Sequence, residues 1–303
     1  MHTWFLSSEY PDTPAPDAAF HIIPVPYEQT VSYGTGTVRG PESILEASGQ
    51  LERLLHDGSE PGLLGIHTLP AVEHTHISDA HTLFSHVAAL VEQTWDLGAI
   101  PLLLGGEHAI TNGPIIALAR RFAPGEVGIL QFDAHMDLRD SYQGTVHSHA
   151  CVMRRAIDAG LRLHQVGVRN YSEEELNVRK RYGITHVDGC DLHQARMSKE
   201  GFAHSKLPGD FPPNLFITFD VDGFDASVMP ATGTPDPGGF FWWEALELLE
   251  RLTDGRTIVG ADIVELAPQQ GLHACEYTAA KLAYHLMGLI ARRNRFPRGR
   301  TSS

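Results

Sequence analysis

Aspartate and histidine side chains gather in two short motifs, each of which directly follows an apolar stretch. The first motif contains Asp133, His135 and Asp137, and the second contains Asp220 and Asp222. Carboxylate oxygens and imidazole nitrogens both bind divalent metal ions, and alternate residues of an extended segment project from the same face. The spacing therefore predicts that each motif directs its ligands toward one point.

A third stretch, residues 105–108, ends in His108 and brings the candidate ligands to six. Four carboxylates and two imidazoles exceed what one catalytic zinc ion requires, but they suit two divalent ions that share carboxylate oxygens. The lack of cysteine in these motifs favours manganese, with other divalent ions as the alternative. We therefore expect a hydrolase with two Mn²⁺ ions per subunit.

Alternating apolar patterns supply the elements that must position these motifs. Eight β-rich runs occur at residues 21–25, 63–69, 101–104, 127–132, 163–168, 184–187, 215–219 and 257–264. Helical patterns lie between them, at residues 41–55, 79–97, 109–122, 150–159, 173–181, 242–252 and 274–291. This alternation predicts an α/β fold, a three-layer α-β-α domain with a parallel sheet of about eight strands. The ligands are then expected at the carboxyl edge of the sheet, where such folds bind ligands.

Length and composition fit one large domain with a substantial core, since the chain has 303 residues and 42% hydrophobic content. We expect a single domain over residues 1–303, with an N-terminal arm at 1–19 and a C-terminal tail at 292–303. The net charge of −14 argues against a nucleic-acid partner. Three scattered cysteines, no signal-like N-terminus and no membrane-length apolar run predict a cytoplasmic protein without a membrane partner.

Together the motifs resemble the signatures of the ureohydrolases, the arginase and agmatinase family. The resemblance is carried by residues 105–108, 132–137, 219–225, 229–235, 238–239 and 262–268, and it covers the chain from about residue 20 to residue 290. It implies an arginase-like fold and a homo-oligomer, either a trimer or a hexamer. It also implies a small cationic guanidine as the substrate.

The resemblance also implies a role for each candidate ligand. His108 and Asp137 would bind one manganese ion, His135 and Asp222 the other, and Asp133 and Asp220 would bridge the two. A hydroxide that bridges the ions would then attack the guanidinium carbon of the substrate.

Two further residues complete the implied catalytic set with Asp133. Glu265 matches the family glutamate that pairs with the substrate guanidinium, in a bidentate geometry that orients the carbon. His149 is the best match to the histidine that protonates the departing amine, and it is expected at a helix start, where the dipole disfavours imidazolium. His147 is the rival for this role.

Residues 139–149 lack the loop pattern of the arginases, and the sequence at residues 148–155 resembles the agmatinase branch. We therefore predict hydrolysis of agmatine to putrescine and urea. Guanidinobutyrate and a distally extended agmatine remain alternatives, and Arg139 or Arg154 would have to pair with an anionic substrate. A metal-binding homologue without turnover is the alternative from another class.

Four positions depart from the common family pattern, namely Glu107, Ala109, Thr218 and Ala226. None of them removes a predicted ligand. They are expected to change hydrogen bonds around the ligands, and such bonds influence metal affinity.

Overall fold

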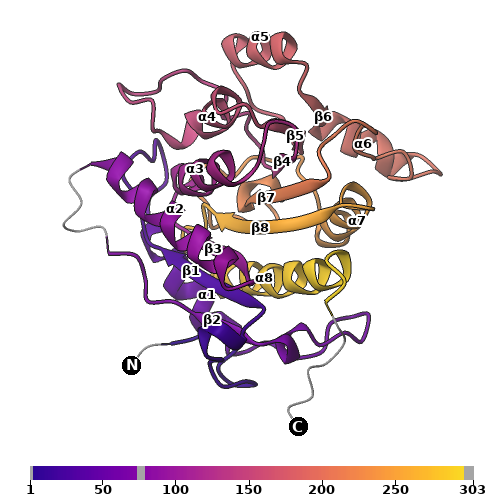
Figure 1. The fold of residues 1–303 in the computed structure, drawn as a ribbon. Coiled ribbons are helices and arrows are strands. Elements are labelled where there is room, and N and C mark those ends of the chain that lie inside the picture. Colours follow the sequence, from indigo (N-terminus) through magenta and orange to yellow (C-terminus); the bar gives the residue numbers. More distant parts are fainter. Residues whose placement is uncertain (1–2, 74–78, 297–303) are drawn as a thin grey trace.

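Eight strands form one sheet at the centre of the computed structural model, which describes residues 3–73 and 79–296 (Figure 1). Their order in the sheet is β2-β1-β3-β8-β7-β4-β5-β6. All neighbours pair in parallel, as the sequence predicts. The bounds are β1 Phe20–Val25, β2 Ile66–Thr68, β3 Ile100–Gly105, β4 Val127–Phe132, β5 Arg162–Val166, β6 Thr185–Val187, β7 Asn214–Asp220 and β8 Thr257–Val264.

Helices cover both faces of the sheet and complete the predicted three layers (Figure 1). Helices α2, α3, α4 and α5 pack on one face, and α1, α6, α7 and α8 pack on the other. The bounds are α1 Gly40–Ser48, α2 Ala80–Asp96, α3 Asn112–Arg121, α4 Val152–Asp158, α5 Glu173–Tyr182, α6 Gly189–Met197, α7 Trp242–Leu252 and α8 His273–Arg293.

Each central strand contributes side chains to two hydrophobic cores, one on each face of the sheet. In β3, Leu102 and Leu104 join the core beneath α1, α7 and α8, whereas Leu103 joins the core beneath α2, α3 and α4. Successive strand residues point to opposite faces, so a strand buried on both faces is apolar throughout. This explains why the strands read as continuous apolar runs in the sequence.

Some predicted boundaries are wrong. The helix expected at 41–55 ends at Ser48, whose hydroxyl donates to the Leu45 carbonyl and accepts from the Leu6 amide. The strand expected at 63–69 is shorter, because Pro61–Leu64 forms a 3-10 helix. Helix α6 was not predicted, since its polar sequence has little helical periodicity.

The expected terminal segments differ in how they join the domain. In the arm, Phe5 and Leu6 are fully buried in the core that contains α1 and α8. At the other end, Arg292 and Arg293 belong to α8 and form ion pairs with Glu250, so the predicted tail begins two residues too early. Residues 297–303 lie outside the described part of the chain.

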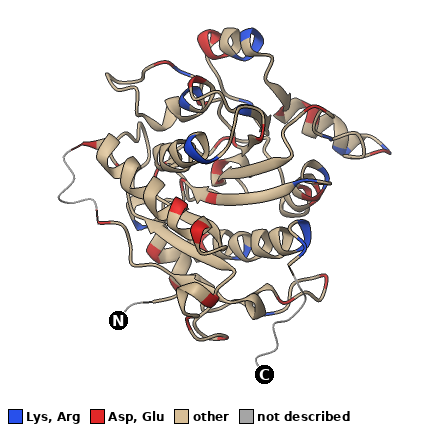
Figure 2. Ribbon diagram, in the orientation of Figure 1, with Lys and Arg blue, Asp and Glu red and all other residues tan. Residues whose placement is uncertain are grey.

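Helix α5 illustrates local signals that the sequence carries directly. Its acidic first turn at residues 173–175 and basic last turn at residues 179–181 are visible as the red and blue ends of the helix in Figure 2. This charge order complements the helix dipole, and Ser172 with Glu175 forms a capping box.

Within the described residues, no helix is both long and apolar enough to span a bilayer.

Candidate metal centre

Four adjacent strands, β3, β8, β7 and β4, deliver the predicted ligands to one edge of the sheet. Glu107 and His108 follow β3, Asp133 follows β4, Asp220 ends β7, and Glu265 follows β8. Because carboxyl ends of parallel strands share one edge, neighbouring strands place these side chains together. The strand order thus joins residues that are more than 150 positions apart in sequence, such as His108 and Glu265.

His108 lies at the centre of the first ligand cluster. Its Nδ1 atom is 3.2 Å from Asp133 Oδ2, 2.9 Å from Asp137 Oδ2 and 3.4 Å from Asp220 Oδ2. His108, Asp133 and Asp220 form a candidate metal-binding group in which every residue is buried. The geometry brings together one imidazole nitrogen and three carboxylate oxygens, a donor set suited to a divalent cation.

His135 forms the second cluster with Asp133 and Asp222. Its Nδ1 atom is 3.0 Å from Asp222 Oδ2 and 3.6 Å from Asp133 Oδ1. Asp133 therefore presents Oδ2 to one imidazole and Oδ1 to the other. A carboxylate that faces two clusters with different oxygens has the arrangement needed to bridge two ions.

The ligands converge through turns, and the extended geometry expected from their alternate spacing is wrong. Strand β4 ends at Phe132, and Asp137 has a positive φ of 53°. The Asp133 side chain accepts from the His135 amide at 2.6 Å, and Asp220 does the same for Asp222 at 2.9 Å. Such side-chain-capped turns redirect the chain within two residues.

The hydrogen bonds of His108 leave its inner nitrogen suited to a metal ion. Nε2 lies 2.8 Å from Thr218 Oγ1, whereas Nδ1 is buried among carboxylates without a hydrogen bond of normal geometry. An imidazole that donates through its outer nitrogen keeps its inner lone pair for a metal. Thr218, one of the departures from the family pattern, thus retains a hydroxyl that orients the ring.

Burial and the close approach of several carboxylates shift the pKa values of the site residues. Burial, and then the neighbouring Asp133, raises the pKa of Asp137 to about 7. Burial, Asp222 and Asp133 raise the pKa of Asp220 well above its usual value. Burial alone would lower the pKa of His108, but the surrounding carboxylates raise it well above normal. The strand-end cavity is lined by His108, His135, Asp137, His149, Asp220, Asp222, Thr234, Glu265 and residues 31–34 and 233. Among the described residues, neither Lys nor Arg lines it, so its carboxylates face imidazoles and one another.

Glu265 lines the same cavity as the ligands. Its Oε1 atom accepts from the His108 amide at 2.6 Å, and its backbone φ is +66°. Burial, and then Glu107, raises the pKa of Glu265 well above normal. A non-glycine residue held at positive φ is strained, and such residues concentrate at functional sites.

The two candidate histidines lie on opposite sides of their loop. His149 lines the strand-end cavity, whereas His147 packs against His81 and Phe84, with a ring distance of 5.7 Å to Phe84. His149 begins the 3-10 helix that precedes α4, at the predicted helix start. Burial, and then His108 and His135, lowers the pKa of His149 to about 4.

Thr30 is a site residue that sequence reasoning missed. Its hydroxyl donates to Glu107 Oε1 at 2.6 Å and therefore accepts from His149 Nδ1 at 3.2 Å. This arrangement leaves Nε2 as the proton-accepting nitrogen of neutral His149. Only tertiary structure brings Thr30 to Glu107, because a lone threonine in a loop carries no sequence signal.

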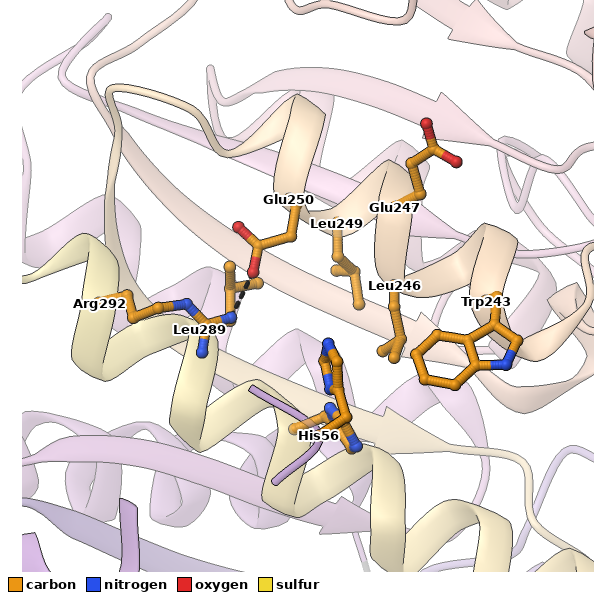
Figure 3. A pocket seen from close by; sticks show the side chains of 9 residues that line it. His56, Trp243, Leu246, Glu247, Leu249, Glu250, Leu289 and Arg292 are labelled. Atoms are coloured by element: carbon orange, nitrogen blue, oxygen red, sulfur yellow. Dashed lines mark hydrogen bonds and ion pairs between the residues drawn. The ribbon is translucent and has the colours of Figure 1, made fainter. Parts of the chain in front are cut away.

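A second hollow lies between α7 and α8 and has a different character (Figure 3). This α7–α8 groove has a volume of about 320 Å³ and is lined by His56, Trp243, Leu246, Glu247, Leu249, Glu250, His285, Leu289 and Arg292. Its acidic groups are paired with arginine, and the ion pair between Arg292 and Glu250 is drawn in Figure 3. The groove contains no group of converging metal ligands among the described residues.

Known proteins share both the sequence pattern and the fold. The model of the arginase family matches residues 18–288. The chain belongs to the arginase family. An N(1)-aminopropylagmatine ureohydrolase from Synechocystis is 36% identical, with 94% of this chain and 92% of the relative covered. An agmatinase from Pyrococcus horikoshii is 32% identical, with coverage of 94% and 96%.

A solved structure gives the same assignment. The agmatine ureohydrolase of Thermoplasma volcanium superimposes with a TM-score of 0.78 at 29% identity, covering 93% of each chain. The protein is thus an enzyme of the ureohydrolase type in the agmatinase branch. Its two candidate metal groups lie at the carboxyl edge of the shared sheet.

Proposed function

We propose that the protein hydrolyses agmatine to putrescine and urea with two Mn²⁺ ions per chain. The observation that carries the proposal is the position of Asp133, whose two oxygens face two separate imidazoles. Glu265 lines the same cavity and supplies a carboxylate for the substrate guanidinium. Two ion positions and a guanidinium partner in one cavity match the requirements of this hydrolysis.

The ligand chemistry supports manganese. His108 and Asp137 would hold one ion, His135 and Asp222 the other, and Asp133 and Asp220 would contact both. This set contains oxygen and nitrogen donors without a thiolate, which suits a hard to borderline divalent ion. When bound, the ions supply the Lewis acidity that makes water nucleophilic at neutral pH.

Glu265 and His149 would then perform the steps that belong to the chain. The Glu265 carboxylate, only 7% exposed, would bind and orient the planar guanidinium through charge-assisted hydrogen bonds. His149 Nε2 would carry a proton to the departing amine, while Thr30 holds Nδ1. Protonation of the amine allows the carbon–nitrogen bond to break.

The charges around the cavity favour a substrate with a cationic tail. No Lys or Arg lines the cavity among the described residues. The two arginines considered for an anionic tail already have acidic partners, since Arg139 lies 3.7 Å from Glu175 and Arg154 lies 3.1 Å from Asp158. Guanidinobutyrate would therefore lack a counter-charge.

N(1)-aminopropylagmatine is the second candidate substrate. It is favoured by the name of the Synechocystis relative, an N(1)-aminopropylagmatine ureohydrolase that is 36% identical to this chain. Its extended amine tail has the same sign of charge as that of agmatine, so the lack of cations at the cavity suits both.

The test is urea release from manganese-loaded protein offered agmatine, N(1)-aminopropylagmatine, guanidinobutyrate and arginine side by side. We expect the highest kcat/KM with agmatine. A higher kcat/KM with N(1)-aminopropylagmatine would leave the proposed reaction type unchanged and make that compound the preferred substrate. Release from none of the four, by protein that binds two ions per chain, would favour a metal-binding homologue without turnover.

A further inference from the structure

A continuous series of polar side chains connects Asp133 to Asp188, which directly follows β6. Gln131 Nε2 donates to Asp133 Oδ2 at 2.7 Å, and Gln165 Nε2 donates to Gln131 Oε1 at 2.7 Å. Arg179 Nε donates to Gln165 Oε1 at 2.9 Å. The Arg179 guanidinium is in turn held by both oxygens of Asp188, at 2.7 and 2.8 Å. We call this series the amide relay.

Arg179 and two backbone carbonyls agree on the direction of every hydrogen bond in the amide relay. Gln165 Nε2 also donates to the Met136 carbonyl at 2.9 Å, and Gln131 Nε2 also donates to the His135 carbonyl at 3.3 Å. A guanidinium only donates, so Gln165 must turn its oxygen toward Arg179 and its amino group toward Gln131. Gln131 must then turn its oxygen toward Gln165 and its amino group toward Asp133. The relay therefore ends in a donor that faces the shared carboxylate.

Sheet register places the relay directly beneath the metal ligands. Gln131 pairs with Gln165 on β5 and with Thr218 on β7, so the three side chains lie at one level of the sheet. Thr218 contacts His108, and Gln131 contacts Asp133. Gln131 and Gln165 are completely buried, as are Thr218 and its neighbour Asp262 on β8. Buried amides are costly unless fully paired, and here their bonding leads to the site.

We propose that Gln131, Gln165 and Arg179 are positioning residues that hold the Asp133 carboxylate in its bridging orientation. The proposal rests on the two-ion site of the proposed function. The donor from Gln131 fixes Oδ2 beside His108, while the His135 amide fixes Oδ1 at 2.6 Å. With both oxygens fixed, the carboxylate cannot rotate away from either cluster.

The first test interrupts the relay without touching Asp133. Gln165→Met removes both of the amide's bonds to its neighbours in the relay, and Arg179→Met removes the terminal cation. Manganese affinity is measured by isothermal titration calorimetry on metal-free protein, and the thermal midpoint of the metal-free form is recorded separately. We expect the dissociation constant of the more weakly bound Mn²⁺ ion to rise by about tenfold to a hundredfold, as for other groups that orient metal ligands.

Arg293→Met provides the matched control. Arg293 is also a partly buried arginine paired with an acid, but its contacts are Thr253 and Glu250, outside the relay. A purely structural effect would lower the thermal midpoint of metal-free protein in all three variants while leaving metal affinity unchanged. The positioning role predicts weakened metal binding only in the two relay variants.

A spectroscopic measurement separates orientation from simple loss of affinity. At saturating Mn²⁺, electron paramagnetic resonance distinguishes a spin-coupled pair of ions from two isolated ions. We expect the coupled signal of the unaltered protein to be altered in Gln165→Met, even when both sites are filled, because the shared carboxylate no longer holds one orientation.

Gln165→Glu sharpens the test because two explanations predict opposite signs. A carboxylate at this position accepts from Arg179 and also from Gln131, so Gln131 must turn its oxygen toward Asp133. This reversal of the relay predicts weaker metal binding. An added negative charge acting only through space would strengthen the binding of a cation, and that result would contradict the relay.

The outcomes of the proposal and of the proposed function are distinguishable, since none of these measurements uses a substrate. Unaltered protein that binds fewer than two ions would overturn both. Unaltered protein that binds two ions, together with relay variants that match it in affinity and spectrum, would overturn the positioning role alone.

Discussion

The strand-end cavity and the α7–α8 groove both collect acidic and imidazole groups, but they neutralise charge in different ways. In the groove, Glu247 pairs with Arg251 at 2.8 Å and Glu250 pairs with Arg292 and Arg293. The side chains of both glutamates are more than 40% exposed. In the cavity, by contrast, the acids are buried and face imidazoles and one another. The acids of the groove thus have arginine partners, whereas those of the cavity have none among the described residues.

The two hollows differ in the free energy that their charges involve. Exposed ion pairs contribute only about 0–1 kcal/mol, so the groove neither gains nor loses much from its charges. Buried acids without a cation are costly by several kcal/mol. The α7–α8 groove is larger than the strand-end cavity, but its volume does not indicate a functional site. Buried acids without Lys or Arg partners among the described residues distinguish the strand-end cavity.

The largest expected effect comes from removal of the shared ligand. Asp133→Ala should lower the manganese content below two ions per chain and reduce kcat by more than about a hundredfold, because both clusters lose an oxygen. Metal analysis after gel filtration and urea release provide the measurements. Glu250→Gln in the groove is the control and should leave both unchanged. An Asp133→Ala protein with normal metal content and turnover would remove the basis of the comparison.

The next largest effect concerns proton delivery. His149→Ala should lower kcat by about a hundredfold or more while the metal content stays at the level of the unaltered protein. His147→Ala should have little effect on either quantity, because His147 packs against Phe84 on the other side of the loop. The reverse result, a loss of turnover in His147→Ala alone, would show that the roles are exchanged.

Mn²⁺ should stabilise the folded protein through the cavity, and residues of the groove should not contribute to this effect. Saturation of one site at a hundred times its dissociation constant raises the free energy of unfolding by about 2.7 kcal/mol, since the ion binds the folded chain. Thermal unfolding with Mn²⁺ and with a chelator measures the difference. Glu250→Gln should retain the full rise, and Asp133→Ala should lose most of it. A chelator that leaves the unfolding midpoint unchanged would argue against a cation-dependent cavity.

The smallest expected effect belongs to the groove and depends on pH. Burial, followed by His56 and Lys281, lowers the pKa of His285 to about 4 from its usual 6.5. Between these values the unfolded state binds more protons than the folded state, so stability falls as pH falls below 6.5 and is unaffected above it. The loss between pH 7 and pH 5 should be about 2 kcal/mol.

Denaturant unfolding at pH 7 and pH 5 checks this dependence. His285→Leu should show a smaller loss over the same interval, because it removes the group that titrates. An equal loss in the variant and the unaltered protein would assign the acid sensitivity to other groups.

Much of the fold was predictable because its signals are local. Apolar runs marked all eight strands, and a helical pattern at residues 173–181 marked α5. Helix α6 was not predictable in this way, since its Leu192 is the only strongly apolar side chain that reaches the core. The early end of α1 depends on a contact between Ser48 and Leu6, 42 residues away.

The candidate ligands and their positions after strands could be read from the sequence, because a strand end and its next residues are neighbours in the chain. Only the tertiary structure decided that β8 lies between β3 and β7, which brings Glu265 to His108. It alone separated His149 from His147 and aligned Gln131 with Gln165. Such pairings arise from sheet register and helix packing, and these depend on many distant contacts that no short motif encodes.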